Sequence, residues 1–436
     1  MKRFRLTFTI FLMSLIMVVS CKEKSDLKAL LNEKDSIALK NKLEEVFIKN
    51  ELVGMSVLVL SDGKIAWHSA FGKANMSQHI PITENTIYRV ASISKTIIAI
   101  AIMQLWEDGK VDLDTDISNY LGWSLRNPKF PDIPITLKQL LSHQSGIRDG
   151  EGYQRFSNDM ISEKLDIREL FLSNESYFTD DQFADHSPGD YFSYANCSWG
   201  IIASVIENVS QQRLDNYCRK EIFKPMALKA DFNVANLTHL DSLAVLYTYD
   251  DEKWISQADD YSDKLPQNRA FEGYELGQNG LLFGPQGSLR SSAKDLSAIA
   301  IMLMNDGTYN NNQILEKATV DFMLKSQWEY NGKNGDTWEN FFLSYGIGIH
   351  QTTNTPNGDI IFPDRKMVGH PGIAYGLLSD MYLEKDKRSG IIFITNGSKN
   401  KFEYGEKSTF YQVEEDIFQT VFPYLKTIEQ NAIPKN

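Results

Sequence analysis

The sequence has little of what several classes of protein require. It holds three cysteines in 436 residues, so no disulfide framework can stabilise it, and its 13 prolines and 27 glycines are too few for a low-complexity chain. Positive charge is also scarce, because 45 Lys and Arg stand against 57 Asp and Glu, a formal net charge of −12. A chain this acidic repels polyphosphates. The composition therefore indicates a globular protein that does not bind nucleic acid.

Several catalytic motifs are also missing. The sequence has no Gly-x-Ser-x-Gly, which excludes the strand-to-helix nucleophile turn of one large hydrolase class. It has no His-Glu-x-x-His, His-x-His or Cys-x-x-Cys, and no glycine-rich phosphate loop with its lysine. We therefore expect no metal ion and no cofactor.

The apolar run near the N-terminus is too short to span a membrane. Leu6–Ser20 follows a short basic stretch and covers about fifteen residues, whereas a spanning helix needs about 20. The run ends at Ser20-Cys21, which resembles a bacterial lipobox, in which the cysteine is lipidated. The resemblance implies a signal peptide over 1–20 and a lipidated tether over 21–36. The protein would then be anchored to a bacterial membrane and face the periplasm or the exterior; a plain signal peptide with an incidental cysteine is the alternative.

Strand patterns lie towards both ends of the chain. Met55–Leu60 and Lys64–Phe71, with an Asp-Gly turn between them, predict one hairpin, and Gly376–Leu383 and Gly390–Thr395 predict another. Helical patterns lie between these hairpins. We therefore expect an α/β fold in which both chain ends form an antiparallel sheet flanked by helices, with an all-α subdomain inserted.

Helical spacing of apolar residues predicts the remaining elements of one hydrolase domain over 37–430. The α/β part is expected over 37–111 and 285–430, and the helical part over 112–284. The Asp- and Tyr-rich stretch 230–275 gives no assignment. Helices are expected over 37–50, 96–108, 137–141, 161–172, 198–209 and 412–425, with another that opens at Ser292.

Ser92-Ile93-Ser94-Lys95 is the first motif that indicates chemistry. Ser-x-x-Lys occurs five times, but only this copy immediately precedes a segment that is apolar nearly all round, so only here do we expect a buried lysine. Burial favours the neutral amine, which can take a proton from a serine one helical turn away. The alternative is a capped helix whose lysine extends to solvent.

Two further motifs could complete such a site. Tyr194-Ala195-Asn196 precedes a predicted helix, where a phenol can relay a proton and a carboxamide can orient a lysine. His370-Pro371-Gly372 leads into the C-terminal hairpin, where a glycine admits a substrate and the next N–H can donate to an oxyanion. Each motif also has a structural explanation: a buried tyrosine with a helix-capping asparagine, or a turn with a partly exposed histidine.

Together, in this order, the three motifs resemble those of the penicillin-recognising serine hydrolases. The resemblance is to the branch that holds class C β-lactamases, DD-peptidases and β-lactamase-like esterases, and it extends over about 37–425. Four further blocks are similar to those of this family: Pro81–Ser92, Ile135–Gly146, Pro285–Arg290 and Thr395–Gly397.

The resemblance implies a role for each residue of the motifs. Ser92 would be the acylated nucleophile, Lys95 its base or proton partner, and Tyr194 the proton shuttle. The substrate-binding groups would be Asn196, His370, and the N–H of Ile373 after Gly372, with the oxyanion held by the N–H groups of Ser92 and Ile373. His143 would be structural.

The third motif departs from the pattern of the family. His370 stands where many relatives carry lysine, and Pro371 where threonine is common, so neither supplies a fixed group for a substrate carboxylate. The leading hypothesis is a membrane-tethered serine hydrolase that acts on a peptide, amide or ester through an acyl-enzyme. A true β-lactamase is one alternative, and a non-catalytic protein that binds peptides or peptidoglycan fragments is another.

Overall fold

The computed structural model describes residues 31–160, 164–262, 266, 273–399 and 403–432. The predicted signal segment and Cys21 lie outside these residues. The predicted tether is described only from residue 31, and helix α1 (Glu33–Lys49) already begins within it. None of the helices in this part of the chain has the length and apolar character that crossing a membrane requires.

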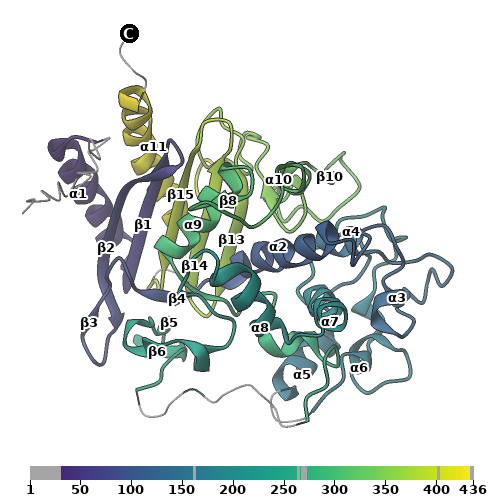
Figure 1. Cartoon of the computed structure of the whole chain (residues 1–436). Helices are drawn as coiled ribbons and strands as arrows, with labels where there is room; N and C mark the ends of the chain where they lie inside the picture. The colour runs from purple at the N-terminus through teal and green to yellow at the C-terminus, as the bar shows by residue number, and fades with distance from the viewer. Residues whose placement is uncertain (1–30, 161–163, 263–265, 267–272, 400–402, 433–436) are drawn as a thin grey trace, which may run out of the picture.

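A nine-stranded sheet, with β10-β11-β12-β13-β14-β15-β1-β2-β3 as its order, is the largest element. Within it, β1 (Gly54–Ser61) pairs with β2 (Lys64–Asn75) on one side and with β15 (Ser389–Thr395) on the other. Strands from both chain ends therefore lie side by side, as Figure 1 shows, and the predicted antiparallel sheet is confirmed. The other strands are β3 (Ile80–Pro81), β10 (Trp328–Glu329), β11 (Ser344–Tyr345), β12 (His350–Gln351), β13 (Val368–Ala374) and β14 (Leu377–Glu384).

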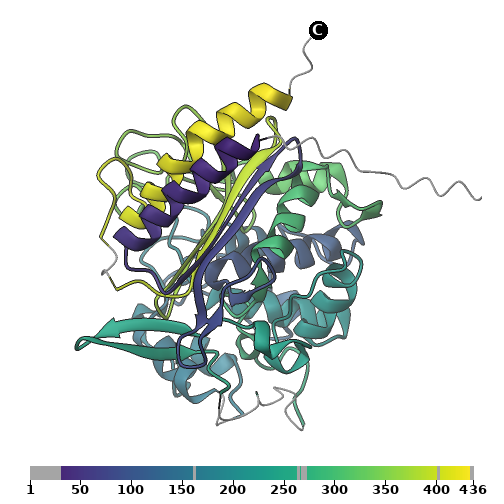
Figure 2. The same cartoon turned by 90° about the vertical axis from the view of Figure 1, so that its left-hand side faces the viewer.

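Helices cover both faces of this sheet, which is why β1 is buried along its whole length. Its residues alternate between two cores: Val57 and Val59 pack with α1 and α11 (Gln412–Ala432), and Leu58 and Leu60 pack with the helices of the other face. Figure 2 shows α1 and α11 lying together on the outer face. The opposite face carries α9 (Ala293–Met304), which Ser292 caps by accepting a bond from the Asp295 N–H.

Helix α2 (Ser94–Glu107) lies between the sheet side and the helical part. Its residues from Ser94 to Met103 are all buried, because α7 (Ser198–Ser210) packs against it from the helical part. The apolar character that predicted a buried helix is thus explained by contacts on both sides. The other helices are α3 (Ser118–Leu121), α4 (Leu137–Leu141), α5 (Glu151–Asp159), α6 (Arg168–Phe171), α8 (Leu214–Cys218) and α10 (Lys317–Leu324).

The predicted helix over 161–172 is wrong in its described part, where only α6 is helical. The Ile167 N–H donates to the Gln278 carbonyl instead of to its own turn, and the Asp166 side chain accepts from the Arg168 N–H. These bonds hold the chain before α6 in an irregular connection. Tertiary bonds of this kind leave no mark on apolar periodicity.

The stretch that gave no assignment contains a hairpin, β5 (Leu246–Asp250) and β6 (Lys253–Ala258), so the inserted part is not wholly helical. The hairpin docks on the end of the large sheet: Val245 N–H donates to Ala74 and Tyr247 N–H donates to Asn396. Shorter pairs are β4 (Ile87–Arg89) with β7 (Arg290–Ser292), and β8 (Thr308–Tyr309) with β9 (Asn312–Gln313).

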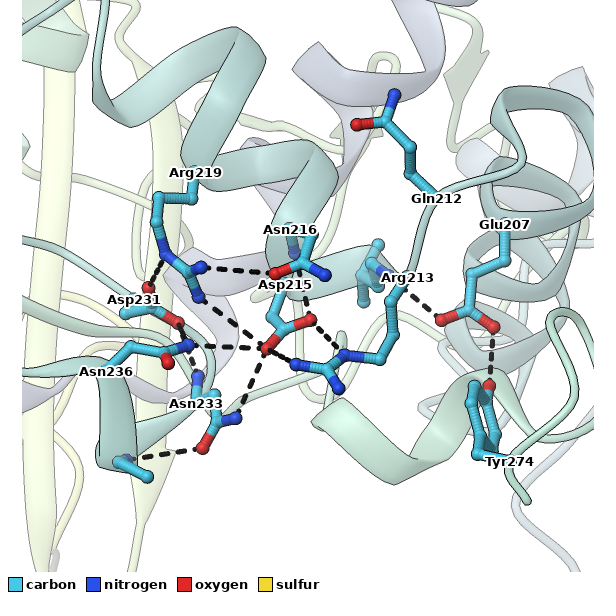
Figure 3. Close-up of polar contacts among 12 residues, drawn as sticks. Glu207, Gln212, Arg213, Asp215, Asn216, Arg219, Asp231, Asn233, Asn236 and Tyr274 are labelled. Atoms are coloured by element: carbon cyan, nitrogen blue, oxygen red, sulfur yellow. Dashed lines mark hydrogen bonds and ion pairs between the residues drawn. The ribbon is translucent and has the colours of Figure 1, made fainter. Parts of the chain in front are cut away.

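Figure 3 shows a buried charge network within the helical part. Asp215 is fully buried and accepts two bonds from the Arg213 guanidinium, at 2.7 and 2.8 Å. Arg219 pairs with Asp231 at 2.8 Å, and the backbone of Asp231 bonds to Arg290 in both directions. Each buried charge thus has a partner, and β7 is fixed against the insert.

Candidate active site

Ser92 lies in a single 3₁₀ turn, Ala91–Ile93, which leads directly into α2. The turn is held on both sides, because Val90 N–H donates to the Leu289 carbonyl and Leu289 N–H donates to Ser94 Oγ. Ala91 has φ +45°, a conformation that costs an L-residue energy. The surrounding bonds therefore impose a strained backbone immediately before the serine, and its side chain stands at the positive end of the helix.

Lys95 is fully buried one turn later and contacts Ser92. Its Nζ lies 3.0 Å from Ser92 Oγ, 2.8 Å from Asn196 Oδ1 and 2.8 Å from the Gln286 carbonyl. Burial lowers the pKa of Lys95 to about 7, against the opposing influence of the Asp149 carboxylate. A large share of the amine is therefore neutral near pH 7 and can accept a proton.

Tyr194 lies on the other side of Ser92, to which its hydroxyl is hydrogen-bonded. Its ring stacks on Phe342 with centroids 5.0 Å apart, and Lys95 Nζ lies over the ring at 5.0 Å. Burial raises the pKa of Tyr194, so the phenol keeps its proton at neutral pH. The structure thus brings together Ser92, Lys95, Tyr194 and Asn196 from two separate motifs.

Asp149 is a residue of this cluster that sequence analysis missed. Its carboxylate accepts from the Asn196 N–H and the Cys197 N–H at 2.8 Å, and from Asn196 Nδ2 at 2.8 Å. The last bond fixes the amide so that its oxygen faces Lys95. Asp149 follows Arg148 in an ordinary loop sequence, and the contact spans 47 residues, so only the block ending at Gly146 marked the neighbourhood.

His143 has the structural position that the resemblance implies. Its Nδ1 accepts from the Ala195 N–H at 3.2 Å, and its carbonyl accepts from the Ser193 N–H. Its ring lies against Tyr194, with centroids 4.3 Å apart. Burial lowers the pKa of His143 well below the usual range. The neutral ring therefore supports the backbone on both sides of Tyr194.

His370 differs from the prediction of a substrate-side donor. The side chain is fully buried and both ring nitrogens have partners: Nδ1 lies 2.6 Å from the Pro371 carbonyl and Nε2 lies 2.8 Å from the Tyr345 hydroxyl. Burial and the nearby Lys95 lower the pKa of His370 well below its usual range. A carbonyl only accepts, so Nδ1 carries the proton and Tyr345 donates to Nε2. No donor of this ring is left for a substrate.

The backbone of β13 offers an N–H at the cavity in place of this ring. β12 pairs only with Val368 and Gly369, and beyond them β13 has an open edge among the described residues. Met367 bonds to Thr352 on that side through both its N–H and its carbonyl. Backbone groups alternate along a strand, so residues 369, 371 and 373 face the same edge. Pro371 has no N–H, which leaves that of Ile373 at the open edge.

Gly372 lets this edge lie against the serine. A Cβ there would stand 2.6 Å from the Val90 carbonyl oxygen and 2.3 Å from Ser379 Oγ, both closer than van der Waals contact. The glycine therefore permits β13 to pack against the turn that carries Ser92, as the predicted role of a close backbone approach requires.

A cavity of about 310 Å³ opens between the serine and the β13 edge. At one end are Ser92, Tyr194 and Asn196, and beside them Pro371 and Ile373 of β13. Aromatic rings form most of the remaining wall, and no lysine, arginine or histidine is among its described residues. The other lining residues are Trp338, Phe341, Phe342, Tyr404, Thr409, Tyr411 and Glu414. The three motifs thus meet at one cavity, and no group of His, Cys, Asp or Glu suited to hold a metal occurs among the described residues.

Two curated proteins are similar to parts of the chain. Protein flp of Staphylococcus aureus (strain N315) is 24% identical over 184 residues, which cover 42% of this chain and 35% of that protein. This chain thus spans about a third of the length of the curated relatives that it matches first. Penicillin-binding protein 4* of Bacillus subtilis (strain 168) is 24% identical over 351 residues, 78% of this chain and 67% of that protein.

Solved structures share the fold. A penicillin-binding protein homologue from Pyrococcus abyssi, described as octameric, has a TM-score of 0.65 at 23% identity, covering 91% of this chain and 79% of that one. EstCE1, described as a hydrolase with promiscuous acyltransferase activity, has a TM-score of 0.63 at 19% identity, covering 89% and 100%. The D-amino acid amidase of Ochrobactrum anthropi SV3 has a TM-score of 0.60 at 19% identity, covering 90% and 99%.

The sequence profile of one family matches nearly the whole domain. That family is described as Beta-lactamase, and the match covers residues 39–413. The match includes the sheet, the helical part and every residue of the cavity except Glu414. The chain therefore belongs to the β-lactamase family of serine hydrolases.

Proposed function

We propose that this protein hydrolyses its substrate through an acyl-enzyme on Ser92. The observation that carries the proposal is the 3.0 Å contact between Ser92 Oγ and Lys95 Nζ, an amine whose pKa burial lowers to about 7. Neutral Lys95 takes the hydroxyl proton as Oγ bonds to the substrate carbonyl carbon. A proton passes through the Tyr194 phenol to the leaving amine or alcohol as its bond to that carbon breaks.

The N–H groups of Ser92 and Ile373 hold the oxyanion in both steps, with the open edge of β13 in support of the second donor. In deacylation, the oxygen of a water molecule bonds to the acyl carbon, and the water gives a proton to neutral Lys95. The bond to Ser92 Oγ then breaks and the serine regains a proton. Asn196, oriented by Asp149, keeps Lys95 in place throughout. In place of the predicted substrate contact, we give His370 a positioning role on β13.

We propose a peptide, amide or ester as the substrate. The amidase and the penicillin-binding proteins among the similar structures and relatives support an acyl substrate of this class. A β-lactam carries a carboxylate, and the described residues of the cavity wall include no lysine, arginine or histidine to bind it, so efficient β-lactamase activity is disfavoured. Rapid turnover of a chromogenic cephalosporin would favour the β-lactamase alternative instead.

Active-site labelling tests the proposal. A fluorophosphonate probe and an activated p-nitrophenyl ester are given to the parent chain and to Ser92→Ala. We expect one adduct per chain on Ser92 and a burst of nitrophenolate, both lost in the variant. An unlabelled parent that still binds peptides would indicate the non-catalytic alternative. Equal labelling of the parent and Ser92→Ala would place the nucleophile elsewhere.

We also propose that the mature protein is lipidated on Cys21 and held in the cell envelope. The support is the short apolar run that ends in Ser20-Cys21 before a polar segment. Metabolic labelling with a fatty-acid analogue, followed by fractionation, compares the parent with Cys21→Ala. We expect label and membrane association in the parent only. Salt-resistant membrane association of an unlabelled Cys21→Ala would contradict the proposal.

A further inference from the structure

Two acidic side chains meet under the wall of the cavity, away from Ser92. Glu414 lines the cavity and lies in the first turn of α11, and Asp380 lies on β14, opposite Pro371. Both are almost completely inaccessible to water, with Glu414 2% and Asp380 0% exposed. The mechanism proposed above uses neither. A buried acid pair beside a substrate cavity therefore needs an explanation of its own.

The pair is incompletely satisfied by the protein. Glu414 Oε2 accepts from the Tyr411 N–H at 2.7 Å, as a first-turn acid does. Neither oxygen of Asp380 meets an N–H or O–H donor among the described residues, and the Glu414 carboxyl is its polar neighbour. Two facing carboxyls can bond only when one of them carries a proton. Burial raises the pKa of both groups, and the neighbouring Glu414 raises that of Asp380 further, so Asp380 holds the shared proton and donates it to Glu414.

The rest of the cavity favours a cation over an anion. Among the described residues that line it, Glu414 is the only charged one and none is basic. The rings of Phe341, Tyr404 and Tyr411 line the same cavity, with Trp338 half exposed at its rim. Aromatic faces attract ammonium groups, and more strongly where water is excluded. The net charge of −12 also favours the approach of cations to this protein.

We infer that the cavity selects substrates whose acyl group carries a protonated amine, which Glu414, supported by Asp380, binds while Ser92 attacks the carbonyl. This inference rests on the proposed function, because it names the substrate class of the same site. The acyl group remains in the cavity during both steps, so an acid there acts on acylation and on deacylation. The ammonium replaces the shared proton as the partner of the two carboxyls, and that proton leaves to solvent.

Matched esters separate charge from shape. The p-nitrophenyl esters of glycine, β-alanine and ε-aminocaproic acid are compared with those of propanoic, butanoic and heptanoic acid, in which a methyl group replaces each ammonium. The quantity measured is the ratio of kcat/KM within each pair. The three chain lengths cover different distances from the serine. Intact Ser92-dependent bursts with the alkanoates show that a variant is folded and that the proposed function holds.

Glu414→Gln and Asp380→Asn remove the charge and keep the size of each side chain. Glu415→Gln is the control, since Glu415 is the neighbouring buried acid on α11 and bonds to Ser408 outside the cavity wall. In the parent, we expect the ammonium ester to be preferred at least tenfold in one pair. Glu414→Gln should lower that ratio about tenfold or more and Asp380→Asn should lower it less, while Glu415→Gln keeps it.

Ratios that are equal in the parent and Glu414→Gln would overturn the inference, as would a parent that prefers the alkanoate in every pair. Absence of any Ser92-dependent burst with all six esters would instead overturn the proposed function. The two failures are therefore distinguishable in the same experiment.

Discussion

The two walls of the cleft are built from different kinds of group. On the helical wall, Ser92, Lys95, Tyr194 and Asn196 form a continuous set of side-chain hydrogen bonds, with Asp149 behind them. On the strand wall, β13 presents a backbone edge, and the rings that line the cavity continue from it. The ionisable group of β13 itself, His370, is buried and turned inward.

This difference suits the two walls to different roles, proton transfer and oxyanion stabilisation. Proton transfer needs side chains whose pKa lies near the working pH, and the helical wall provides one in Lys95. Stabilising an oxyanion needs fixed donors, and backbone N–H groups of a strand are fixed by the sheet. Substitutions on the helical wall should therefore change the chemical step and its pH dependence. Substitutions of the side chains of β13 itself should chiefly change stability.

The largest effect is expected for Lys95→Ala. Loss of a proton-transfer group typically costs ~10²–10⁴ in rate, so kcat on an activated ester should fall by about this factor. Lys294→Ala is the matched control, because Lys294 ends another Ser-x-x-Lys but lies exposed at the start of α9. Steady-state kinetics compares the two. Retention of parental kcat by Lys95→Ala would show that another group takes the proton.

The next effect tests the backbone of the strand wall. Ile373→Pro removes one N–H at the open edge, where no partner strand is lost, so the sheet tolerates it as it tolerates Pro371. Loss of one oxyanion donor costs about 10²–10³ in kcat. Ile373→Ala keeps the N–H and should stay within about threefold of the parent in the same assay. Equal losses of kcat in the two variants would show that catalysis depends on the Ile373 side chain and not on its N–H.

The contrast between the walls also explains how much the sequence predicted. The buried helix after Ser92 and the two hairpins were predictable, because local periodicity sets them. The inward position of His370 was not predictable, because it depends on Tyr345, 25 residues earlier, whose hydroxyl donates a hydrogen bond to Nε2 of the ring. Asp149 was missed for the same reason: its bonds to Asn196 cross 47 residues. Motif spacing identifies which residues matter and says little about which way a side chain turns.

A smaller effect, on stability, is expected for His370→Gln. A glutamine amide takes the place of only one of the two ring nitrogens, so the bond to Tyr345 or the bond to Pro371 is lost, and the free energy of unfolding at pH 7 should fall by about 1–3 kcal/mol. The lowered pKa of His370 also predicts a pH effect. Below about pH 6.5 the unfolded chain binds a proton here and the folded chain does not, so parental stability falls with decreasing pH by up to about 1.4 kcal/mol per unit.

Urea unfolding between pH 7.5 and pH 5 measures both the loss of stability in the variant and the pH dependence of stability in the parent. The variant should be less stable than the parent at pH 7.5. The difference between their free energies of unfolding should be smaller by about 2 kcal/mol at pH 5. His186→Gln, at an exposed position, is the control. A difference in stability that does not change with pH would show that the pKa of His370 is the same in the folded and the unfolded chain. If kcat of His370→Gln were as low as that of Lys95→Ala, His370 would be a proton-transfer group.

The smallest effect is a shift of the pH profile in Asp149→Asn. The Asp149 carboxylate raises the pKa of Lys95 against the stronger lowering by burial, which leaves it at about 7. Lys95 acts as a base only when neutral, so kcat/KM should rise with pH through about 7 in the parent. Asparagine removes the charge, and the midpoint of this rise should therefore move to lower pH. Glu151→Gln, exposed and two residues along the chain, should leave the midpoint unchanged. A midpoint that moves upward in Asp149→Asn would mean that the pH profile reports a group whose pKa Asp149 does not raise. Lys95 would then not be the base on the helical wall.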